Sequence, residues 1–184
     1  SLLLGLVILW GTDFAYKHLE AHQRKRIDVF LGQNVNNSKE GYNLHQAEIA
    51  IGSGGFFGKG FLQGTQTKLN YVPAHATDFI FCTLCEEWGF VGASFIVLIY
   101  LVLLVRIIFL AERQRSPFSR IYGYGVASVF FIHIAVNVGM TLGLLPVIGI
   151  PLPFMSYGGS SLWSFTLLLF IFLRLDANRL QILK

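Results

Sequence analysis

The chain has 184 residues, of which 54% are hydrophobic and only 13% are charged. Soluble domains carry about 25% charged residues, so an ordinary soluble protein is excluded. The net charge of +4 does not indicate nucleic-acid binding, because the basic residues mostly flank apolar runs, where they set topology and meet anionic headgroups. Since those runs are continuous rather than alternating, we predict an all-α integral membrane protein, a multi-pass bundle of transmembrane helices.

Apolar runs and polar interruptions divide the chain into spans and connections. They are the end of a span (1–11), a large external loop (12–78), a span (79–110), a cytoplasmic loop (111–120), a span (121–145), an external Pro/Gly loop (146–161), a span (162–175) and a cytoplasmic tail (176–184). The first segment is too short for a crossing of ~20 residues, so we expect the C-terminal part of a longer protein. The sides follow from the basic short loops, because cytoplasmic loops are rich in Lys and Arg.

The large loop begins with apolar and basic residues interleaved over residues 14–30, as in a helix lying at a membrane surface. A turn-rich stretch follows at 34–41, and a helical pattern begins at Tyr42 and is broken from Gly52 onward. The glycines around Lys59 have two interpretations: backbone amides that cradle a phosphate, or tight packing of a folded loop. The spacing fits neither the Walker pattern nor the dinucleotide-binding fingerprint, so both interpretations remain open.

Three acidic residues follow the glycine cluster. Asp78 lies between a proline turn and an apolar run, where partial desolvation suits a general base. The alternative is that Thr77 or Asp78 caps a helix beginning at Phe79. Glu86 and Glu87 would either assist Asp78 or mark the water boundary.

Four further side chains within the apolar runs have mainly structural interpretations. Cys82 and Cys85 form a C-x-x-C pair with apolar flanks and no second pair to complete a zinc site, which favours buried thiols over a redox motif. His133 and Asn137 lie four residues apart and so on one helix face. They are either a functional pair facing the bundle interior or, as we favour, a His–Asn hydrogen bond fastening neighbouring helices.

Long motifs carry a family resemblance. They are AIGSGGFFGKGFLQGTQ (50–66), PAHATDF (73–79), EEWGFVG (86–92) and GIPLPFMSYGGSS (149–161). Together they resemble the SEDS family, named for shape, elongation, division and sporulation. HQRKRI (22–27) and GKGFLQGTQ (58–66) are more similar to its elongation members than to its division members. The resemblance implies a membrane fold of about ten helices, of which this chain would hold roughly the last four.

The resemblance also implies a peptidoglycan glycosyltransferase. Such an enzyme polymerises lipid II, an undecaprenyl-pyrophosphate-linked disaccharide pentapeptide, on the outer face of the bacterial cytoplasmic (inner) membrane during elongation and rod-shape maintenance. A class B penicillin-binding protein would be the transpeptidase partner. The family's essential carboxylate falls on Asp78, which would be the general base of an inverting displacement. Rival functions are a lipid II flippase, or a scaffold that only recruits the penicillin-binding protein.

The remaining candidate residues surround Asp78 in the two external loops. Lys59, Lys68, Arg24 and Arg26 would meet the pyrophosphate, with help from a divalent cation such as Mg²⁺ or Mn²⁺; no metal ligand is identified. Gln46, Gln63 and Gln66 would meet sugar hydroxyls, beside Thr77, Glu86 and Glu87; Pro151, Pro153, Ser156, Tyr157 and Gly158 would shape the cavity mouth. Three positions depart from the family pattern: Ala74, Ala76 and Cys85 stand where Glu, His and Gly are usual.

Overall fold

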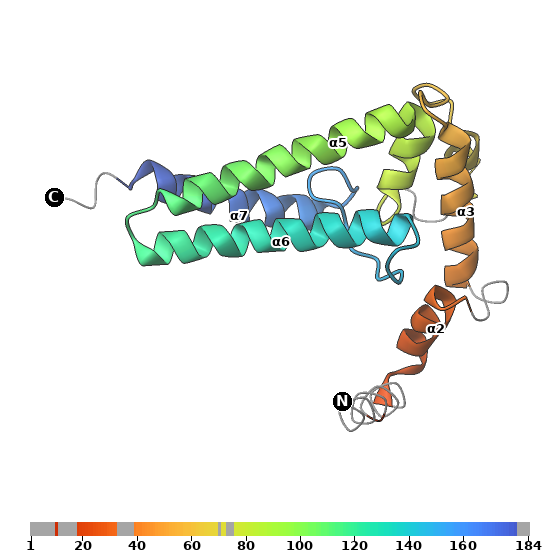
Figure 1. Cartoon of the computed structure of the whole chain (residues 1–184), viewed down its shortest axis with the longest axis horizontal. Coiled ribbons are helices and arrows are strands. Elements are labelled where there is room, and N and C mark those ends of the chain that lie inside the picture. Colours follow the sequence, from red (N-terminus) through yellow and green to blue (C-terminus); the bar gives the residue numbers. More distant parts are fainter. Residues whose placement is uncertain (1–9, 11–17, 33–38, 70, 73–75, 180–184) are drawn as a thin grey trace, which may run out of the picture.

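The computed structural model describes residues 10, 18–32, 39–69, 71–72 and 76–179 (Figure 1). Across these ranges every regular element is a helix, which confirms the predicted all-α class. The helices are α2 (Ala21–Phe30), α3 (Lys39–Gly54), α4 (Thr65–Lys68), α5 (Ile80–Glu112), α6 (Pro117–Thr141) and α7 (Gly159–Ala177). Of these, α5, α6 and α7 are long and apolar enough to cross a membrane. The predicted span end at 1–11 lies, except for residue 10, outside the described residues.

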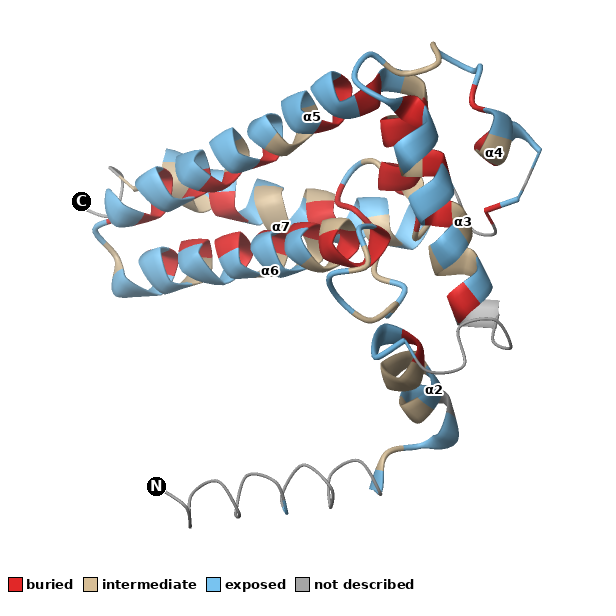
Figure 2. Cartoon of the chain, turned by 45° about the vertical axis from the view of Figure 1, so that its right-hand side comes forward, coloured by how far each residue is buried: buried red, intermediate tan, exposed pale blue. Residues whose placement is uncertain are grey.

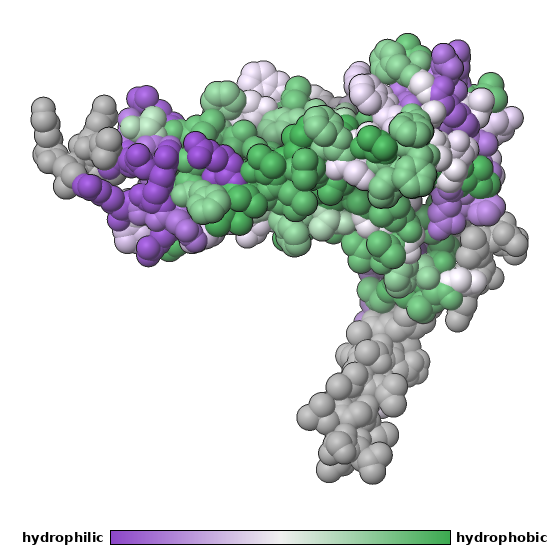
Figure 3. All heavy atoms as spheres, turned by 45° about the horizontal axis from the view of Figure 1, so that its top comes forward, coloured by the Kyte–Doolittle hydropathy of each residue, from purple (hydrophilic) through white to green (hydrophobic). Residues whose placement is uncertain are grey.

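The three long helices lie side by side (Figure 1) and bury a common core. Each contributes large side chains to it: Tyr100, Leu104 and Ile107 from α5, Val126 and Phe130 from α6, and Phe165 and Phe172 from α7. Figure 2 shows the buried residues along the facing sides of these helices. The outward side chains are also apolar, and Figure 3 shows hydrophobic residues covering the middle of the bundle with hydrophilic ones gathered at its ends. This is the pattern of a helix bundle surrounded by lipid.

The two ends of the bundle are built differently. At one end, the short turn 113–116 meets the end of α7, where Arg113 and Gln114 bond to Asp176. At the other end α3 runs across the bundle, beside the connection 142–158 (Figure 1). That connection turns back into the bundle: Leu152 is 1% exposed, and the Tyr100 hydroxyl donates to the Pro153 carbonyl at 2.6 Å. The Gly-rich and Pro-rich segments therefore lie at the same end.

Several helices begin or end a few residues away from the bounds predicted from the sequence. The connection expected over 111–120 shrinks to 113–116, because Pro117 stands at the first position of α6, which suits its fixed φ and missing N–H. Since α6 ends at Thr141, the following connection begins four residues before Pro146. Helix α3 continues through Gly52 to Gly54, where a Cβ would lie only 2.0 Å from the Cys85 carbonyl oxygen. Of the surface helix predicted over 14–30, the structure shows α2 (Ala21–Phe30), and residues 14–17 lie outside the described part.

Helix α5 is broken at Gly89, which has φ 67° and ψ −166°. The loop 55–60 supplies hydrogen-bond partners for the backbone groups on both sides of this break. The amides of residues 59 and 60 donate to the carbonyls of residues 86 and 87, each at 3.0 Å, and the amides of residues 90 and 91 donate to those of 55 and 56. A side chain at Gly58 (φ +77°) would strike the Glu87 carbonyl at 2.2 Å. Gly54, Gly58 and Gly89 are therefore required by close backbone packing, and the amides of residues 58–60 are already occupied by protein carbonyls.

Candidate active site

Asp78 lies in the turn that precedes α5. The N-cap position of α5 is Phe79, and no side chain caps the helix, so the helix-cap interpretation of Thr77 and Asp78 is wrong. The Asp78 carboxylate is half-buried and forms no hydrogen bond or ion pair with any residue that the structure describes. The residues just before it, 73–75, lie outside the described part. Asp78 therefore presents an acceptor that the described protein leaves unused.

The backbone beneath that carboxylate is held firmly. The three consecutive carbonyls of residues 76–78 accept, in chain order, from the backbone N–H of Tyr157 at 2.8 Å, the hydroxyl of Ser156 at 2.6 Å, and the side-chain amide of Asn137 at 2.9 Å. Ser156 in turn accepts from the Leu152 amide at 2.7 Å. The predicted residues Thr77, Ser156 and Tyr157 are thus brought together with Asp78, by backbone as much as by side-chain bonds.

The Pro-rich connection also faces the carboxylate itself. Gly149 has φ +80°, and a Cβ there would lie 3.0 Å from Asp78 Oδ2. The preceding carbonyl, of Ile148, accepts from Arg26 Nη1 at 2.9 Å. Arg26 comes from α2, so the structure places one predicted cation next to the loop that borders Asp78. Arg24 on the same helix instead donates to the Leu19 carbonyl.

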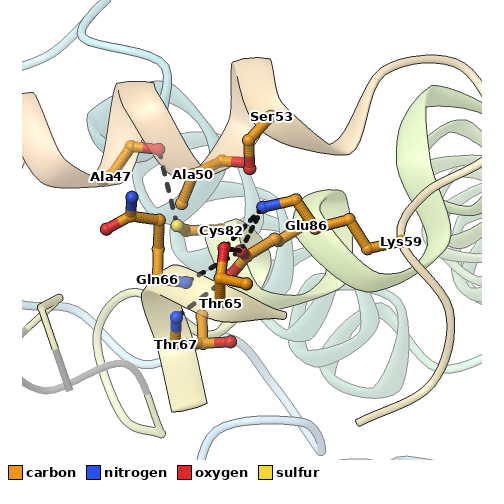
Figure 4. Close-up of polar contacts among 9 residues, drawn as sticks. All are labelled: Ala47, Ala50, Ser53, Lys59, Thr65, Gln66, Thr67, Cys82 and Glu86. Atoms are coloured by element: carbon orange, nitrogen blue, oxygen red, sulfur yellow. Dashed lines mark hydrogen bonds and ion pairs between the residues drawn. The ribbon is translucent and has the colours of Figure 1, made fainter. Parts of the chain in front are cut away.

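A second carboxylate, Glu86, is enclosed by the Gly-rich loop (Figure 4). It is 0% exposed, and its oxygens accept from Lys59 Nζ at 2.9 Å, from the amides of Gln66 and Thr67 at 2.9 and 3.1 Å, and from the Thr65 hydroxyl at 3.3 Å. Lys59 also donates to Thr65. The positive charge of Lys59 is therefore matched within the protein, which the sequence pattern did not indicate.

The remaining predicted site residues differ in their position relative to these two carboxylates and in their exposure. Glu86 lies about two helical turns beyond Asp78, and Lys59 and the Gln66 amide bond to Glu86 rather than to Asp78. Gln63 and Lys68 are exposed. The Oε1 atom of Gln66 is buried without a partner. Gln46 and Glu87 are half-buried, and Tyr157 is 81% exposed.

Buried residues between α3 and α5 have structural roles. Cys82 and Cys85 are free and buried, and Cys82 Sγ donates to the Ala47 carbonyl at 3.5 Å. This confirms the predicted buried thiols. Cys85 packs against Gly54, so its departure from the family pattern falls at a helix contact and not beside Asp78. Ala76 contributes a backbone carbonyl to Tyr157, while Ala74 lies outside the described residues.

The favoured prediction of a hydrogen bond between His133 and Asn137 is wrong. Asn137 makes no bond to His133; its Nδ2 donates to the carbonyls of Asp78 and Ile150, while His133 Nδ1 lies 3.2 Å from the Pro151 carbonyl. Both side chains bind loops rather than each other. The sequence did contain a signal for these contacts: two polar residues lie in a membrane span shortly before a proline-rich loop. Backbone carbonyls of a loop at membrane depth need hydrogen-bond donors, and such residues can supply them.

Three helices long and apolar enough to cross a membrane, with a carboxylate at one end that has no partner among the described residues, define a polytopic membrane protein with a candidate catalytic acid. The chain belongs to the cell cycle protein family that comprises FtsW, RodA and SpoVE, whose sequence model matches residues 1–181. This confirms the resemblance to the SEDS family.

Individual relatives agree in sequence and structure. The chain is 40% identical over 179 residues to the peptidoglycan glycosyltransferase RodA of Treponema pallidum, covering 96% of this chain and 41% of that protein. It is 43% identical over 141 residues to the peptidoglycan glycosyltransferase MrdB of Escherichia coli K12, covering 77% and 38%. The chain thus spans less than half the length of these curated relatives.

Two solved structures share the fold. One, described as the structural coordination of polymerization and crosslinking by a peptidoglycan synthase complex, matches with a TM-score of 0.73 and 30% identity, covering 97% of this chain and 49% of that one. The other, an aspartate-to-alanine mutant of the rod shape determining protein RodA of Thermus thermophilus, matches with a TM-score of 0.56 and 36% identity, covering 72% and 40%.

Proposed function

We propose that this chain forms part of a peptidoglycan glycosyltransferase that polymerises lipid II during cell elongation and rod-shape maintenance, with Asp78 as its general base. The observation that carries the proposal is the contrast at Asp78, whose backbone carbonyl is held by Asn137 at 2.9 Å while its carboxylate has no described partner. The names of the relatives, peptidoglycan glycosyltransferases RodA and MrdB, support the same activity.

The proposed reaction is a single displacement. Asp78 accepts the proton of the acceptor sugar's 4-hydroxyl as that oxygen bonds to the anomeric carbon of the donor. The bond from the anomeric carbon to the lipid pyrophosphate breaks, and the pyrophosphate leaves with the bonding electron pair. Because the donor is α-linked and the product β-linked, the anomeric centre inverts. A base on the acceptor and a cationic contact for the leaving group are the two groups this reaction needs.

Among the predicted cations, Arg26 is the best supported for the leaving group. Its Nη1 bonds to the Ile148 carbonyl, next to the glycine that faces Asp78 Oδ2, and one guanidinium has further donors for a phosphate oxygen. Lys59 is a weaker candidate because Glu86 already neutralises it. Gln46, Gln63, Gln66, Lys68, Arg24, Glu87, Ser156 and Tyr157 remain proposed contacts for sugar or pyrophosphate along the rim.

A divalent cation has no ready set of protein ligands here. Over the residues that the structure describes, no three His, Cys, Asp or Glu side chains gather to hold a metal ion. The described residues therefore do not fit a metal site built by the protein alone, and no step above passes through a metal.

The proposed setting is the bacterial cytoplasmic (inner) membrane, with the Asp78 end outside and the C-terminus in the cytoplasm. The basic residues Arg113, Arg115 and Arg120 at the opposite end support this orientation, because positive loops stay inside. A class B penicillin-binding protein is the proposed partner. The similar peptidoglycan synthase complex, described as coordinating polymerization and crosslinking, supports such a pairing.

The test is Asp78→Asn in the full-length protein with purified lipid II and its transpeptidase partner. The variant should lose glycan polymerisation by at least ~10²-fold, the lower range for a general base, with unchanged folding and partner binding. Glu112→Gln is the matched control, since Glu112 is an exposed carboxylate at the opposite end of the bundle.

The same variant separates the enzyme from a lipid II flippase. A flippase needs a polar path but no base at Asp78, so it would still move fluorescent lipid II across vesicles when Asp78 is an amide. Normal polymer from Asp78→Asn would reject the assignment of the base.

A further inference from the structure

Asn137 connects the turn that carries Asp78 to the Pro-rich connection. It is fully buried in α6, and its Nδ2 donates to the Asp78 carbonyl at 2.9 Å and to the Ile150 carbonyl at 2.7 Å. These partners lie 59 and 13 residues away in the chain. A side-chain amide has two N–H donors, so both are used in binding these loops.

The two bonded carbonyls belong to the two segments that meet at the Asp78 carboxylate. In the first segment, the bonded carbonyl belongs to Asp78 itself, so its position fixes the backbone from which the carboxylate projects. In the second, Ile150 follows Gly149, whose Cα faces Asp78 Oδ2 closely enough that a Cβ would lie 3.0 Å from it. One side chain therefore binds both the residue that carries the carboxylate and the loop segment that faces it.

The other hydrogen bonds in this region do not join Asp78 itself to the Pro-rich connection. The Ser156 hydroxyl donates to the Thr77 carbonyl and the Tyr157 amide to the Ala76 carbonyl, both upstream of the acid. His133, one turn before Asn137 on α6, reaches only the Pro151 carbonyl. Asn137 alone among these donors binds the acidic residue and the facing loop together.

We propose that Asn137 is a positioning residue for the reaction: it does not touch substrate, but it holds the Asp78 carboxylate at its working distance from the Pro-rich loop. This inference rests on the proposed function. A displacement of about 1 Å at a reacting group costs on the order of 10²-fold in rate, so loss of the two bonds acts mainly on the chemical step.

The kinetic experiment uses the full-length protein with its transpeptidase partner and purified lipid II. Asn137→Leu keeps the approximate shape and removes both donors; we expect kcat to fall about 10- to 100-fold with KM nearly unchanged. Asn137→Ser keeps one donor, and its kcat should lie between those of Asn137→Leu and the wild type. This variant still tests the inference if Asn137→Leu fails to fold.

Thr141→Val is the matched control. Thr141 lies one turn further along α6, is also fully buried, and its hydroxyl donates to a carbonyl of its own helix, that of Val138, at 2.8 Å. Its replacement removes a buried hydrogen bond from the same helix without touching either loop, so polymerisation should stay close to that of the wild type. An equal loss of kcat in Thr141→Val would overturn the inference, because the effect would then be general destabilisation.

A second readout does not depend on activity. Asp78→Cys is introduced with Cys82→Ala and Cys85→Ala, and the rate of maleimide labelling at position 78 is compared with and without Asn137→Leu. We expect the leucine variant to change that rate several-fold and Thr141→Val to leave it unchanged. If Asp78→Asn still polymerised, the proposed function would fail while this labelling still tested the positioning. An unchanged labelling rate, or normal kcat in Asn137→Leu, would overturn the inference.

Discussion

Asp78, just before α5, and Glu86, about two turns further along the chain, are carboxylates with opposite surroundings. Glu86 is fully buried and accepts from Lys59, Thr65 and two backbone amides. Asp78 is half-buried and its carboxylate has no described partner, although its main-chain carbonyl is firmly held. A carboxylate with all its acceptors occupied by protein stabilises a fold, whereas one left open on a fixed backbone is available to a ligand.

The difference predicts that variants at the two sites separate stability from activity. Changes around Glu86 should lower the stability of the loop, and any loss of activity should follow that loss of folding. Changes around Asp78 should lower activity more than stability. Four substitutions break or sharpen this contrast.

Lys59→Met has the largest expected effect on stability. It leaves the buried Glu86 carboxylate without its counter-ion, which costs about 3–5 kcal/mol in comparable sites. We expect the lower part of that range, because two amides and the Thr65 hydroxyl still bond to Glu86. Thermal unfolding of the detergent-solubilised full-length protein measures this. If Lys59 instead served only the substrate, unfolding would be unchanged and only polymerisation would fall.

Ser156→Ala comes next. It removes the donor to the Thr77 carbonyl and the acceptor of the Leu152 amide, and a buried group left unpaired costs about 1–3 kcal/mol. We expect a lower unfolding midpoint together with slower polymerisation, since both bonded segments border Asp78. Ser128→Ala is the control, because its hydroxyl bonds within its own exposed helix turn. Equal effects in the two variants would contradict a specific role for Ser156.

Gly149→Ala should cost about 1–2 kcal/mol for the left-handed backbone alone. The added methyl would lie 3.0 Å from Asp78 Oδ2, so we expect the loss of polymerisation to exceed the loss expected from stability. Gly143→Ala provides a comparison, because Gly143 shares the positive φ but faces Glu48 instead. The prediction fails if both variants lose activity in equal measure.

Thr65→Val has the smallest expected effect, about 0.5–1.5 kcal/mol for one partly exposed hydrogen-bonding group. Glu86 keeps Lys59 and both amides, so polymerisation should remain within about twofold of the wild type after correction for folded protein. A large loss of activity at full stability would show that Thr65 contacts substrate.

The helical bundle could be predicted from sequence because its signal is local. Continuous apolar runs around residues 79–110, 121–145 and 162–175 correspond to α5, α6 and α7. Their ends moved by a few residues where Pro117 and Gly159 start helices earlier than hydropathy alone suggests. Membership of the family was also predictable, because long motifs carry it.

The partners of the polar residues could not be predicted in the same way. Lys59 and Glu86 are 27 residues apart, and Asn137 and Asp78 are 59 apart. No periodicity relates such positions, so Lys59 was expected at a pyrophosphate and Asn137 at His133. Only the folded backbone shows that the kink at Gly89 brings the first pair together and that the Pro-rich loop brings the second.

The loop 55–60 beside the break in α5 has a consequence for biosynthesis. Residues 55–60 leave the ribosome before residues 86–91, yet each segment supplies the other's missing hydrogen bonds. The hydrogen bonds of this loop must therefore remain incomplete until α5 has been synthesised. Formation of the kinked part of α5 and closure of the loop are therefore a single late event in the synthesis of the chain.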